Sequence, residues 1–598
     1  MDIDTLPKFF LEKVHTFSDK VALREKDLGI WQQITWQDYY KHVGDLALGF
    51  LALGIERGNH IAILGDNCRE WLYADLAAQC ISCISVGIYP TDVSPQVKYI
   101  LDDSDAKLVV VKDQEQADKV LEVKNELPLL KKVVVVDMKG LRKYSDPCIV
   151  SFEEVEKLGQ ENNEQSPRFF EDMIQSTKTE DVALMVYTSG TTGVPKGAML
   201  THRNLISMIE GLFQILPLSP DDSLISSLPL CHIAERSFSV IFPMYVGCTI
   251  NFAESINTLS ENIKEICPTV FLNVPRIWEK FNSSIMIKMR DAVFFKQYIF
   301  GALMPVGYRV ADFKLQKKDV PLIWKCLYAM SYLLLFRALR KHLGLLQARI
   351  FVNGAAPVSS DICRFFLAIG VPIKNCYGAT ETSGISTMPE LDDVSIGIAG
   401  KPIPSLQMRL SSDGEILIKG DSVFSGYYKN KKATEDAIRD GWLYTEDIGE
   451  FDEQGNLSIT DRKKDIIITA GGKNIAPSSI ENRLKFNPHI KEAIVIGDRR
   501  KYLTALIQID YENVSVWAQN NAVPYTNYKS LAKNPKIFSL IWDIVTDVNK
   551  DFARVETIKK ITILEKELDF DDEEVTATMK VRRNFIEVKY RDLINSLY

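Results

Sequence analysis

Short apolar runs rich in β-branched residues alternate with amphipathic stretches in the first quarter of the chain. The runs are His60 to Leu64, Leu108 to Lys112 and Lys132 to Val136, and the stretches are residues 70–85 and 113–124. Apolar runs of this length are typical of strands buried on both faces, as in parallel sheets covered by helices. The alternation therefore predicts an α/β fold built from βαβ units.

The chain is long enough for more than one domain. It has 598 residues, whereas single hydrophobic cores stop growing at roughly 250–300 residues. Around residues 407–419 the apolar period changes to two, with Asp413-Gly414 at the turn, which predicts a hairpin in a β-rich subdomain. After Asp461 the chain becomes more polar, and a smaller α+β unit is expected. Its expected strands are residues 491–496, 503–509 and 561–564, and its expected helices are residues 478–485 and 536–554.

The bulk composition is that of an ordinary globular protein, with 46% hydrophobic and 25% charged residues. A net charge of −8 gives no electrostatic reason to expect nucleic acid as a partner. The ten cysteines are scattered, and Cys80 and Cys83 lie in an apolar helical stretch, which favours core packing over redox or zinc chemistry. Residues 1–13 contain no apolar run, so we expect no secretory signal and a reducing, cytoplasmic location.

Residues 319–344 differ from the rest of the chain. An uncharged run of eleven residues, Cys326 to Phe336, lies between Lys325 and Arg337. Such a run is too short to span a bilayer, which needs about twenty residues. The pattern fits a basic amphipathic helix on a membrane surface and a buried core helix equally well.

Residues 187–197, Tyr-Thr-Ser-Gly-Thr-Thr-Gly-Val-Pro-Lys-Gly, are of the kind that binds phosphates. Glycine lets backbone N–H groups approach a polyanion, hydroxyls add donors, and Lys196 adds a positive charge. The P-loop pattern fails twice, because Pro195 precedes the lysine and Gly197 follows it. By itself the segment favours a bound nucleoside triphosphate over a flexible surface loop. Its candidate ligand-binding residues are Thr188, Ser189, Gly190, Thr191, Thr192, Gly193 and Lys196.

Five further motifs follow this loop along the chain. They are Leu228-Pro229-Leu230-Cys231-His232, Gly354-Ala355-Ala356-Pro357, Tyr377-Gly378-Ala379-Thr380-Glu381, Gly441-Trp442-Leu443-Tyr444-Thr445-Glu446-Asp447 and Asp461-Arg462-Lys463-Lys464-Asp465. In type, order and spacing the series resembles that of the adenylate-forming superfamily, which includes acyl-CoA synthetases, luciferases and peptide-synthetase adenylation domains. The resemblance extends from Phe10 to about Phe585. Residues 274–280 and 578–583 are most similar to those of long-chain fatty acyl-CoA synthetases.

The resemblance implies two domains and two half-reactions. Residues 1–460 would form the large N-terminal domain, and residues 461–598 a small mobile lid with its hinge near Asp461. A fatty acid carboxylate would attack the α-phosphate of ATP to give acyl-AMP and pyrophosphate, and the thiol of CoA would then displace AMP. An anionic nucleophile can approach a polyphosphate only where Mg²⁺ and basic side chains offset the charge.

The resemblance also implies which residues meet the phosphates. Lys196 and the loop backbone would hold the β- and γ-phosphates. Glu381 would bind Mg²⁺, with Thr188 as a weaker candidate, since this ion prefers one or two carboxylates together with phosphate oxygens. Lys580 would meet the α-phosphate and the acyl carboxylate during adenylation. Without the motifs, Glu381 is equally explained as a surface or capping carboxylate, and Lys580 as a solvated lysine.

The implied nucleoside site is formed by residues of the middle motifs. Tyr377 would stack on adenine, Asp447 would bind both ribose hydroxyls, and Arg462 would reach the ribose or a phosphate. The structural alternatives are a core aromatic for Tyr377 and turn or surface charges for the other two. The family commonly has glycine in the place of Glu446, so a positive φ there would strain the backbone. The remaining implied nucleotide-binding residues are Gly354, Ala355, Ala356, Pro357, Gly378 and Thr380.

Two further motifs concern the acyl group and CoA. Gly472 and Lys473 resemble the segment that approaches the pantetheine arm after the lid rotates, although Lys473 can also be a plain surface charge. His232 is implied to touch the acyl carboxylate or to gate its tunnel, against the alternative of a core histidine. Some long-chain relatives have an aromatic gate where this chain has Arg236, so the gating of the tunnel is left open.

The sequence therefore predicts an ATP-dependent long-chain fatty acid–CoA ligase. Within the same chemistry, transfer to a carrier-protein thiol and activation of an aromatic or branched acid stay open. From other classes, a phosphotransferase would release ADP, and a nucleotide-binding scaffold would not catalyse. A fatty substrate favours the membrane-surface interpretation of residues 319–344, as a peripheral contact on the inner face of a membrane.

Overall fold

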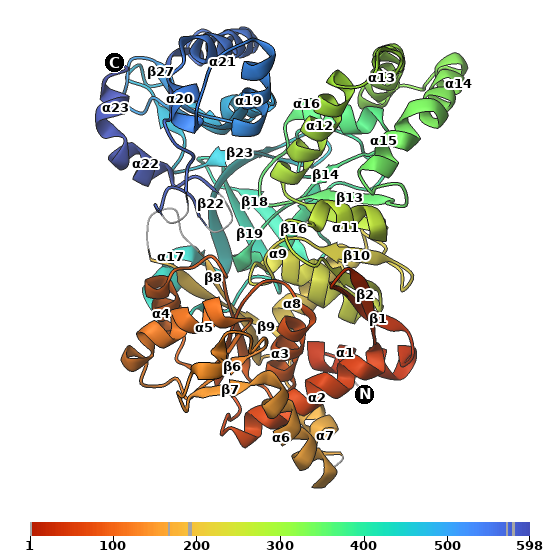
Figure 1. Ribbon diagram of the computed structural model, residues 1–598, viewed down its shortest axis with the longest axis vertical. Coiled ribbons are helices and arrows are strands. Elements are labelled where there is room, and N and C mark those ends of the chain that lie inside the picture. The colour runs from red at the N-terminus through yellow and green to blue at the C-terminus, as the bar shows by residue number, and fades with distance from the viewer. Residues whose placement is uncertain (1–2, 166–167, 189–193, 570–571, 577–579) are drawn as a thin grey trace.

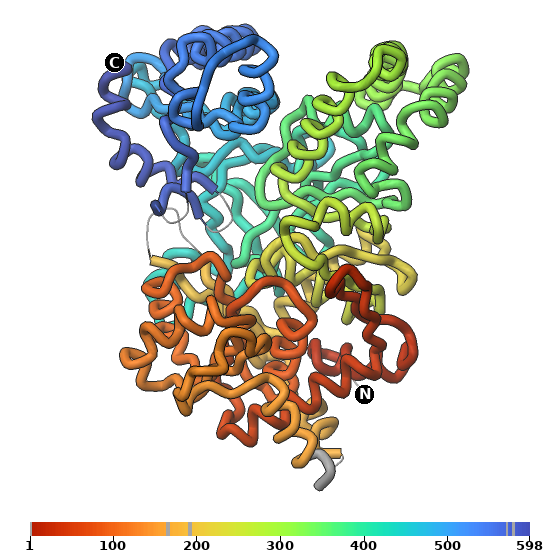
Figure 2. The backbone as a smooth tube through the Cα atoms, in the orientation of Figure 1, coloured from red at the N-terminus to blue at the C-terminus, as the bar shows by residue number. Residues whose placement is uncertain are grey.

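The computed structural model describes residues 3–165, 168–188, 194–569, 572–576 and 580–598. Figure 1 shows a large N-terminal part, a smaller C-terminal part, and a helical projection beside the latter. The tube in Figure 2 shows the blue C-terminal residues gathered in a lobe of their own. The predicted α/β class is confirmed, and the reasons lie in the first sheet.

An eight-stranded sheet organises the first part of the chain, with the strand order β20-β9-β8-β4-β3-β5-β6-β7. Strands β3 to β8 run parallel, whereas β9 and β20 are antiparallel to their neighbours. All three predicted strands are present, the first with the bounds expected. The strands are β3 (His60–Leu64), β4 (Ile84–Ile88), β5 (Ala106–Val111), β6 (Lys132–Val135), β7 (Ile149–Ser151), β8 (Val182–Thr188), β9 (Lys196–Thr201) and β20 (Gly426–Tyr427).

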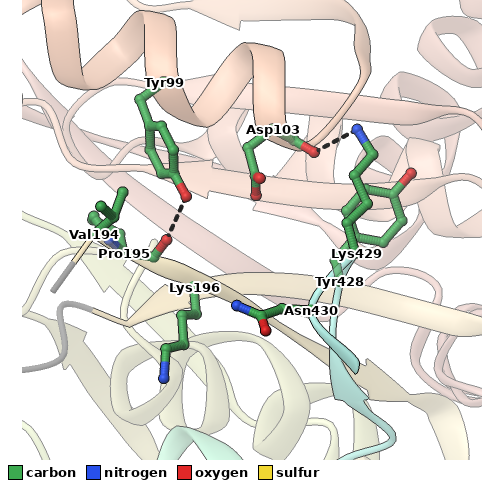
Figure 3. Close-up of a pocket in the computed structure, with 8 residues that line it drawn as sticks. All are labelled: Tyr99, Asp103, Val194, Pro195, Lys196, Tyr428, Lys429 and Asn430. Carbon is green, nitrogen blue, oxygen red and sulfur yellow. Dashed lines mark hydrogen bonds between the residues drawn. The ribbon is translucent and has the colours of Figure 1, made fainter. Parts of the chain in front are cut away.

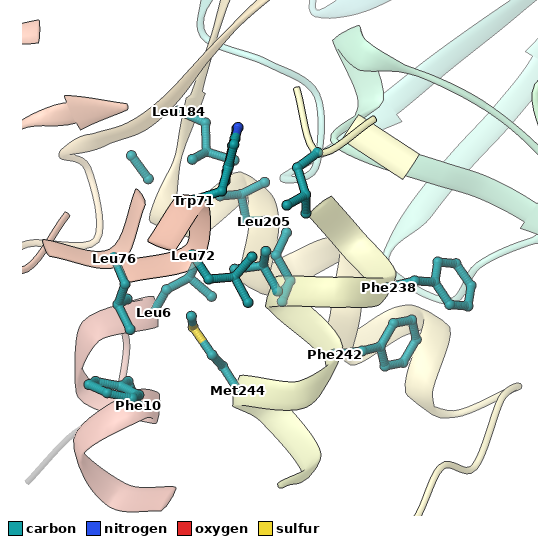
Figure 4. Close-up of a cluster of buried hydrophobic side chains, with 14 of the residues drawn as sticks. Leu6, Phe10, Trp71, Leu72, Leu76, Leu184, Leu205, Phe238, Phe242 and Met244 are labelled. Carbon is teal, nitrogen blue, oxygen red and sulfur yellow. The ribbon is translucent and has the colours of Figure 1, made fainter. Parts of the chain in front are cut away.

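Both faces of this sheet are buried, which explains why its strands are continuously apolar. On β3, Ile61 and Ile63 belong to one hydrophobic cluster, whereas Ala62 and Leu64 belong to a second cluster on the opposite face. Figure 4 shows the first cluster, where side chains from widely separated helices meet. The covering helices are α1 (Leu6–Phe17), α2 (Trp36–Ala52), α3 (Arg69–Cys80), α4 (Ser94–Asp103), α5 (Gln114–Val123), α6 (Phe152–Gln165), α7 (Phe169–Ser176) and α8 (His202–Phe213).

The prediction of one amphipathic stretch over residues 70–85 is wrong. Helix α3 ends at Cys80, and every residue from Trp71 to Cys80 is buried. The helix packs against α2 and also contacts α1 and α7, so no face of it is left for solvent. The chain then enters β4. Cys80 and Cys83 are free and buried, as expected for core residues.

Smaller sheets extend the N-terminal part. The Asp413-Gly414 hairpin is confirmed between β18 and β19, and Gly414 supplies the positive φ of +82° at its turn. The strands of these sheets are β1 (Val21–Asp27), β2 (Ile30–Thr35), β10 (Ser223–Ser226), β11 (Thr249–Phe252), β12 (Val270–Asn273), β13 (Ile350–Asn353), β14 (Lys374–Asn375), β15 (Tyr377–Ala379), β16 (Gly384–Met388), β17 (Lys401–Pro402), β18 (Leu406–Leu410), β19 (Glu415–Gly420), β21 (Ile438–Arg439), β22 (Trp442–Phe451) and β23 (Leu457–Arg462).

The C-terminal part has its own sheet and its own hydrophobic clusters. The order is β26-β27-β28, and all three strands and both helices predicted from the sequence are present. The elements are β24 (Ile467–Ile468), β25 (Asn474–Ile475), β26 (Ile490–Ile496), β27 (Leu503–Ile509), β28 (Ile558–Ile563), α18 (Pro477–Lys485), α19 (Tyr511–Asn520), α20 (Tyr528–Ala532), α21 (Pro535–Val548), α22 (Arg583–Lys589) and α23 (Arg591–Asn595).

The helical projection is built from residues 275–342. It consists of α12 (Pro275–Arg290), α13 (Phe294–Leu315), α14 (Leu322–Ser331), the π-helical turn η4 (Tyr332–Phe336) and α15 (Arg337–His342). The last three form one helix of 21 residues, Leu322–His342. The uncharged run from Cys326 to Phe336 is therefore the middle of a longer helix.

Candidate active site

Three predicted nucleoside-site residues form a chain of polar contacts. The Tyr377 hydroxyl donates to Asp447 Oδ2 at 2.8 Å, and Arg462 Nε lies 3.5 Å from Asp447 Oδ1. Asp447 and Arg462 face each other in the register of β22 and β23, while Tyr377 begins β15. Pairing between strands therefore sets the Asp447–Arg462 contact. The Tyr377 hydroxyl binds the other oxygen of the same carboxylate.

Burial is the main influence on Asp447. It raises the pKa of the Asp447 carboxyl, against the opposing effects of Arg462, the Tyr377 hydrogen bond and Lys580. A carboxylate held this way keeps lone pairs that can accept from two vicinal hydroxyls. Lys580, from the far end of the chain, acts on the same carboxyl through its positive charge.

Lys580 lies at the exposed edge of the group, its backbone N–H bound to Thr576 Oγ1. Desolvation by the surrounding protein and repulsion from Arg462 lower its pKa to about 8, although Asp447 acts in the opposite sense. Part of the side chain is still open to solvent, so the electrostatic influence of its neighbours is partly screened. A lysine with a pKa in this range can switch between charged and neutral forms near physiological pH.

Two contacts position the C-terminal part relative to β23 and the N-terminal helices. Asp461 accepts hydrogen bonds from the backbone N–H and hydroxyl of Ser478, at the start of α18, at 3.1 and 2.9 Å. Arg483 Nη1 of the same helix pairs with Asp361 Oδ2 at 2.8 Å, in α16 (Ser360–Ala368). The arrangement with Lys580 beside Asp447 is thus supported from both ends of α18. The hinge at Asp461 stays a prediction.

Lys196 and Glu381 are connected through Tyr427, which the sequence analysis missed. The Tyr427 hydroxyl donates to Glu381 Oε1 at 2.7 Å, and Lys196 Nζ lies 5.1 Å from the centre of the Tyr427 ring. Strand β20, which carries Tyr427, pairs with β9, which begins at Lys196. No chemical signal in the sequence marks Tyr427, because its role depends on this pairing between distant strands.

The end of the phosphate loop is anchored by a tyrosine outside the motifs. Tyr99 donates its hydroxyl hydrogen to the carbonyl oxygen of Pro195 at 2.8 Å, and both residues line a cavity of about 250 Å³. In Figure 3 the Lys196 side chain points away from Tyr99 and Asp103. Ser189, Gly190, Thr191, Thr192 and Gly193 lie outside the described residues. Thr188 ends β8 directly opposite Lys196.

Glu381 suits a magnesium site of the expected kind. One of its oxygens accepts from Tyr427, so the other can face a cation. Within the residues that the structure describes, no three His, Cys, Asp or Glu side chains gather as a metal cage. Mg²⁺ accepts a single protein carboxylate when phosphate oxygens and water complete its octahedron, so Glu381 fits this ion.

The remaining nucleotide-motif residues lie on turns. Ala355 has a φ of +69°, and its neighbour Ala356 accepts a hydrogen bond from Asn353 Nδ2 at 2.7 Å, which fixes the loop at the end of β13. Gly354 and Pro357 belong to the same loop. Gly378 packs directly on Gly384, where any Cβ would meet a backbone oxygen at 1.7 Å. Thr380 begins the short 3₁₀ turn that carries Glu381.

Glu446 confirms the strain expected at its position. It has a φ of +60°, the left-handed region in which glycine is favoured. Its backbone N–H donates to Glu415 Oε1 at 3.0 Å, and its side chain pairs with Lys464 at 2.8 Å. These contacts hold the strained residue directly before Asp447.

His232 caps helix α9 (Ile233–Arg236) and contributes to the same electrostatic group. Its Nδ1 accepts from the Ala234 backbone N–H at 3.2 Å, so the ring proton of the neutral form lies on Nε2. Burial, followed by repulsion from Lys580, lowers the His232 pKa to about 4. His232 is therefore a neutral donor near Lys580.

Arg236 is fully buried, four residues after His232. Its Nη2 lies 3.2 Å from Asp75 Oδ1 and donates to Ser85 Oγ at 3.1 Å, while its guanidinium covers the Trp71 ring at 4.6 Å. Both charged side chains have an exposed fraction of 0%. The position at which some long-chain relatives have an aromatic gate is thus occupied by a buried ion pair between α9 and α3.

Gly472 and Lys473 belong to a hairpin of the C-terminal part. They form the turn between β24 and β25, with a φ of +76° at Gly472, and Lys473 is exposed. The Lys473 backbone N–H donates to Thr469 Oγ1 at 3.2 Å within the same hairpin. Among the described residues, no hydrogen bond or ion pair joins Lys473 to Asp447 or Lys580. Its approach to CoA stays a prediction.

Comparison with known proteins identifies the family of this chain. The family described as AMP-binding enzyme matches residues 10–428, and the AMP-binding enzyme C-terminal domain matches residues 464–598. The chain belongs to the AMP-binding enzyme family, and it is an AMP-forming acid–thiol ligase of the adenylate-forming, acyl-CoA ligase type. The family decides against a phosphotransferase that releases ADP and against a scaffold without catalysis.

The similar proteins are named for related activities. A long-chain-fatty-acid–CoA ligase, FadD15 of Mycobacterium bovis, is 32% identical over 573 residues, covering 95% of this chain and 93% of the relative. The anthranilate CoA ligase AuaEII in complex with anthranoyl-AMP has a TM-score of 0.73 at 20% identity, covering 100% and 99% of the two chains. The Bacillus subtilis o-succinylbenzoate coenzyme A synthetase in complex with ATP and magnesium ion has a TM-score of 0.66 at 20% identity, covering 96% and 98%.

Proposed function

We propose that this ligase activates long-chain fatty acids with ATP and Mg²⁺ and transfers the acyl group to CoA. The observation that carries the proposal is the contact of Arg462 with Asp447, together with the charge of Lys580, from the opposite end of the C-terminal part, acting on the same carboxylate. The long acyl chain and CoA as acceptor are supported by the name of the curated relative.

The residues divide the chemistry between binding and charge compensation. Asp447, fixed by Tyr377, accepts from the ribose hydroxyls, and Lys196 neutralises the distal phosphates. Mg²⁺, bound to Glu381 and phosphate oxygens, would lower the repulsion that an incoming carboxylate meets. Lys580, when protonated, offsets the negative charge that builds at the α-phosphate as the new P–O bond forms and pyrophosphate leaves.

His232 orients the acid in this scheme. Its neutral ring offers the Nε2–H as a donor to one carboxylate oxygen, which leaves the other oxygen free to attack. Because the His232 pKa is about 4, the ring stays neutral throughout the physiological range. His232 can therefore position the acyl carboxylate without protonating it, and the carboxylate keeps the negative charge that it needs as a nucleophile.

Exchange of labelled pyrophosphate into ATP tests the proposal with a panel of carboxylic acids. We expect exchange with acids of long saturated chain, none without acid, and AMP as the nucleotide product once CoA is added. Exchange that is faster with short, aromatic or branched acids would contradict the substrate class. Acyl transfer to a carrier-protein thiol, with none to CoA, would contradict the acceptor.

A further inference from the structure

The helical projection carries many of the exposed apolar side chains of this protein. In the described part of the chain, 26 large hydrophobic side chains are exposed, and ten of them lie within residues 286–334. Three have exposed fractions of 70% or more, which few large apolar side chains retain without a partner. The ten are Met286, Val293, Phe294, Phe295, Tyr298, Leu322, Ile323, Met330, Leu333 and Leu334.

The exposed side chains of helix 322–342 follow a helical stripe. Leu322, Cys326, Met330 and Leu333 recur every three or four residues and are exposed, as are Ile323 and Leu334 beside them. The opposite face is buried, and Leu335, Phe336 and Leu339 belong to a core cluster of the N-terminal part. This helix therefore presents apolar side chains outwards as well as inwards, whereas an ordinary surface helix has a polar outer face.

Helix α13 shows the same orientation at its N-terminal half. Phe294, Tyr298, Ala302 and Pro305 are exposed at helical spacing, and Arg309 continues the stripe. Helix α13 contacts α14 and η4 of helix 322–342, and the two helices project from the molecule away from the eight-stranded sheet (Figures 1 and 2). We call residues 286–346 the apolar-basic hairpin.

The charge of this hairpin is opposite to that of the whole protein. Residues 286–346 contain eleven Lys and Arg against three Asp, an excess of eight positive charges, whereas the complete chain has a net charge of −8. Lys325, Arg337 and Lys341 are exposed along the apolar helix itself. Exposed apolar side chains flanked by cations are the composition of a helix that lies in the interface of an anionic bilayer.

We propose that the apolar-basic hairpin docks on the surface of an anionic lipid bilayer, with the exposed sides of α13 and helix 322–342 against the acyl–headgroup boundary. Helix 322–342 is long enough and apolar enough to cross a membrane by length and composition. Its buried face, however, packs on α13 and on the core, which places it along the surface. The core-helix interpretation left open by the sequence explains this buried face and does not explain the exposed one.

Docking of this kind would bring the ligase to its substrate, because fatty acids partition into bilayers. This benefit rests on the proposed function, whereas the docking itself does not. Cations around the hairpin would favour anionic over neutral headgroups. Salt should weaken the attraction, because the Debye length is only about 8 Å at physiological ionic strength.

Co-sedimentation of the full chain with lipid vesicles tests the proposal. We expect binding to mixed phosphatidylserine–phosphatidylcholine vesicles, at least tenfold weaker binding to pure phosphatidylcholine, and loss of binding in high salt. Leu333→Gln with Leu334→Gln should weaken binding to the mixed vesicles at least tenfold. The matched control, Ile256→Gln with Val588→Gln, changes two equally exposed apolar residues elsewhere and should bind as the unchanged protein does.

The charge is tested separately. Lys325→Gln with Arg337→Gln should reduce the preference for phosphatidylserine, whereas Lys139→Gln with Lys431→Gln, two exposed lysines outside the hairpin, should not.

The proposal would be overturned if the unchanged chain did not bind the mixed vesicles. It would also be overturned if the variant with the Leu333 and Leu334 substitutions bound them equally well. Vesicle-independent dimers that the same substitutions abolish would show that a second copy covers the surface, which also overturns it. Pyrophosphate exchange with a soluble acid should be unchanged in all four variants, so failure of docking is distinguishable from failure of the proposed function.

Discussion

Lys580 offers the sharpest test of the site, because its proton is predicted to control the first half-reaction. Its pKa of about 8 lies well below the ordinary value of about 10.4. Only the protonated side chain can offset phosphate charge, so the competent fraction of free enzyme is near complete at pH 7 and about one tenth at pH 9. We expect kcat/KM for ATP in pyrophosphate exchange to fall tenfold per pH unit above about 8.

Three variants separate this titration from other causes. Lys580→Ala should lower exchange by about 10²–10³-fold, the usual cost of removing one preorganised charge-stabilising group. Lys580→Arg, which stays protonated, should be slower than the unchanged enzyme and should lose the alkaline decline. Arg462→Gln should move the decline to higher pH, because repulsion from Arg462 helps to lower the Lys580 pKa.

Acyl transfer from preformed acyl-AMP to CoA is the control reaction, and it should change far less than exchange in all three variants. Retention of exchange within about tenfold in Lys580→Ala would refute the assigned role. An unchanged alkaline decline in Lys580→Arg would show that another group titrates.

Three further predictions concern neighbouring contacts. Tyr377→Phe removes the hydroxyl that donates a hydrogen bond to Asp447. The KM for ATP should rise about 10-fold or more, as expected for loss of a hydrogen bond to a charged group. An unaltered KM would contradict a role of this contact in ATP binding. Asp75→Asn leaves the Arg236 charge buried without its partner, so denaturant titration should show a free energy of unfolding about 3–5 kcal/mol lower. Asp75→Leu with Arg236→Met should restore most of this stability. Equal losses in the two variants would argue against an electrostatic cause. Asp361→Asn breaks a partly exposed ion pair to α18 that is worth at most about 1 kcal/mol. Adenylation should therefore slow no more than about fivefold, and transfer to CoA should not slow. A slower transfer would contradict a role of this ion pair in holding the adenylation arrangement.

The local elements of the fold could be predicted from the sequence because their signals are local. The conformation of an apolar run such as His60–Leu64, or of the Asp413-Gly414 turn, can be predicted from a few consecutive residues. The stretch at residues 70–85 failed for the converse reason. Burial of all sides of α3 depends on α1, α2 and α7, and no periodicity within the helix reports it.

The candidate site divides in the same way. Asp447, Arg462 and Lys580 were named from motifs, and strand register together with packing of the C-terminal part then brings them together. The roles assigned to them remain predictions. Tyr427 carries no motif signal, since its contact with Glu381 arises only when β20 pairs with β9.

By itself, then, the sequence determined the succession of strands and helices, the family and the chemical types available to the site. Tertiary structure alone decided that Arg236 pairs with Asp75 inside the core and that helix 322–342 turns its apolar stripe outwards. The physical reason is that backbone periodicity is fixed by neighbours along the chain, whereas the burial and charge environment of a side chain are fixed by residues distant in sequence.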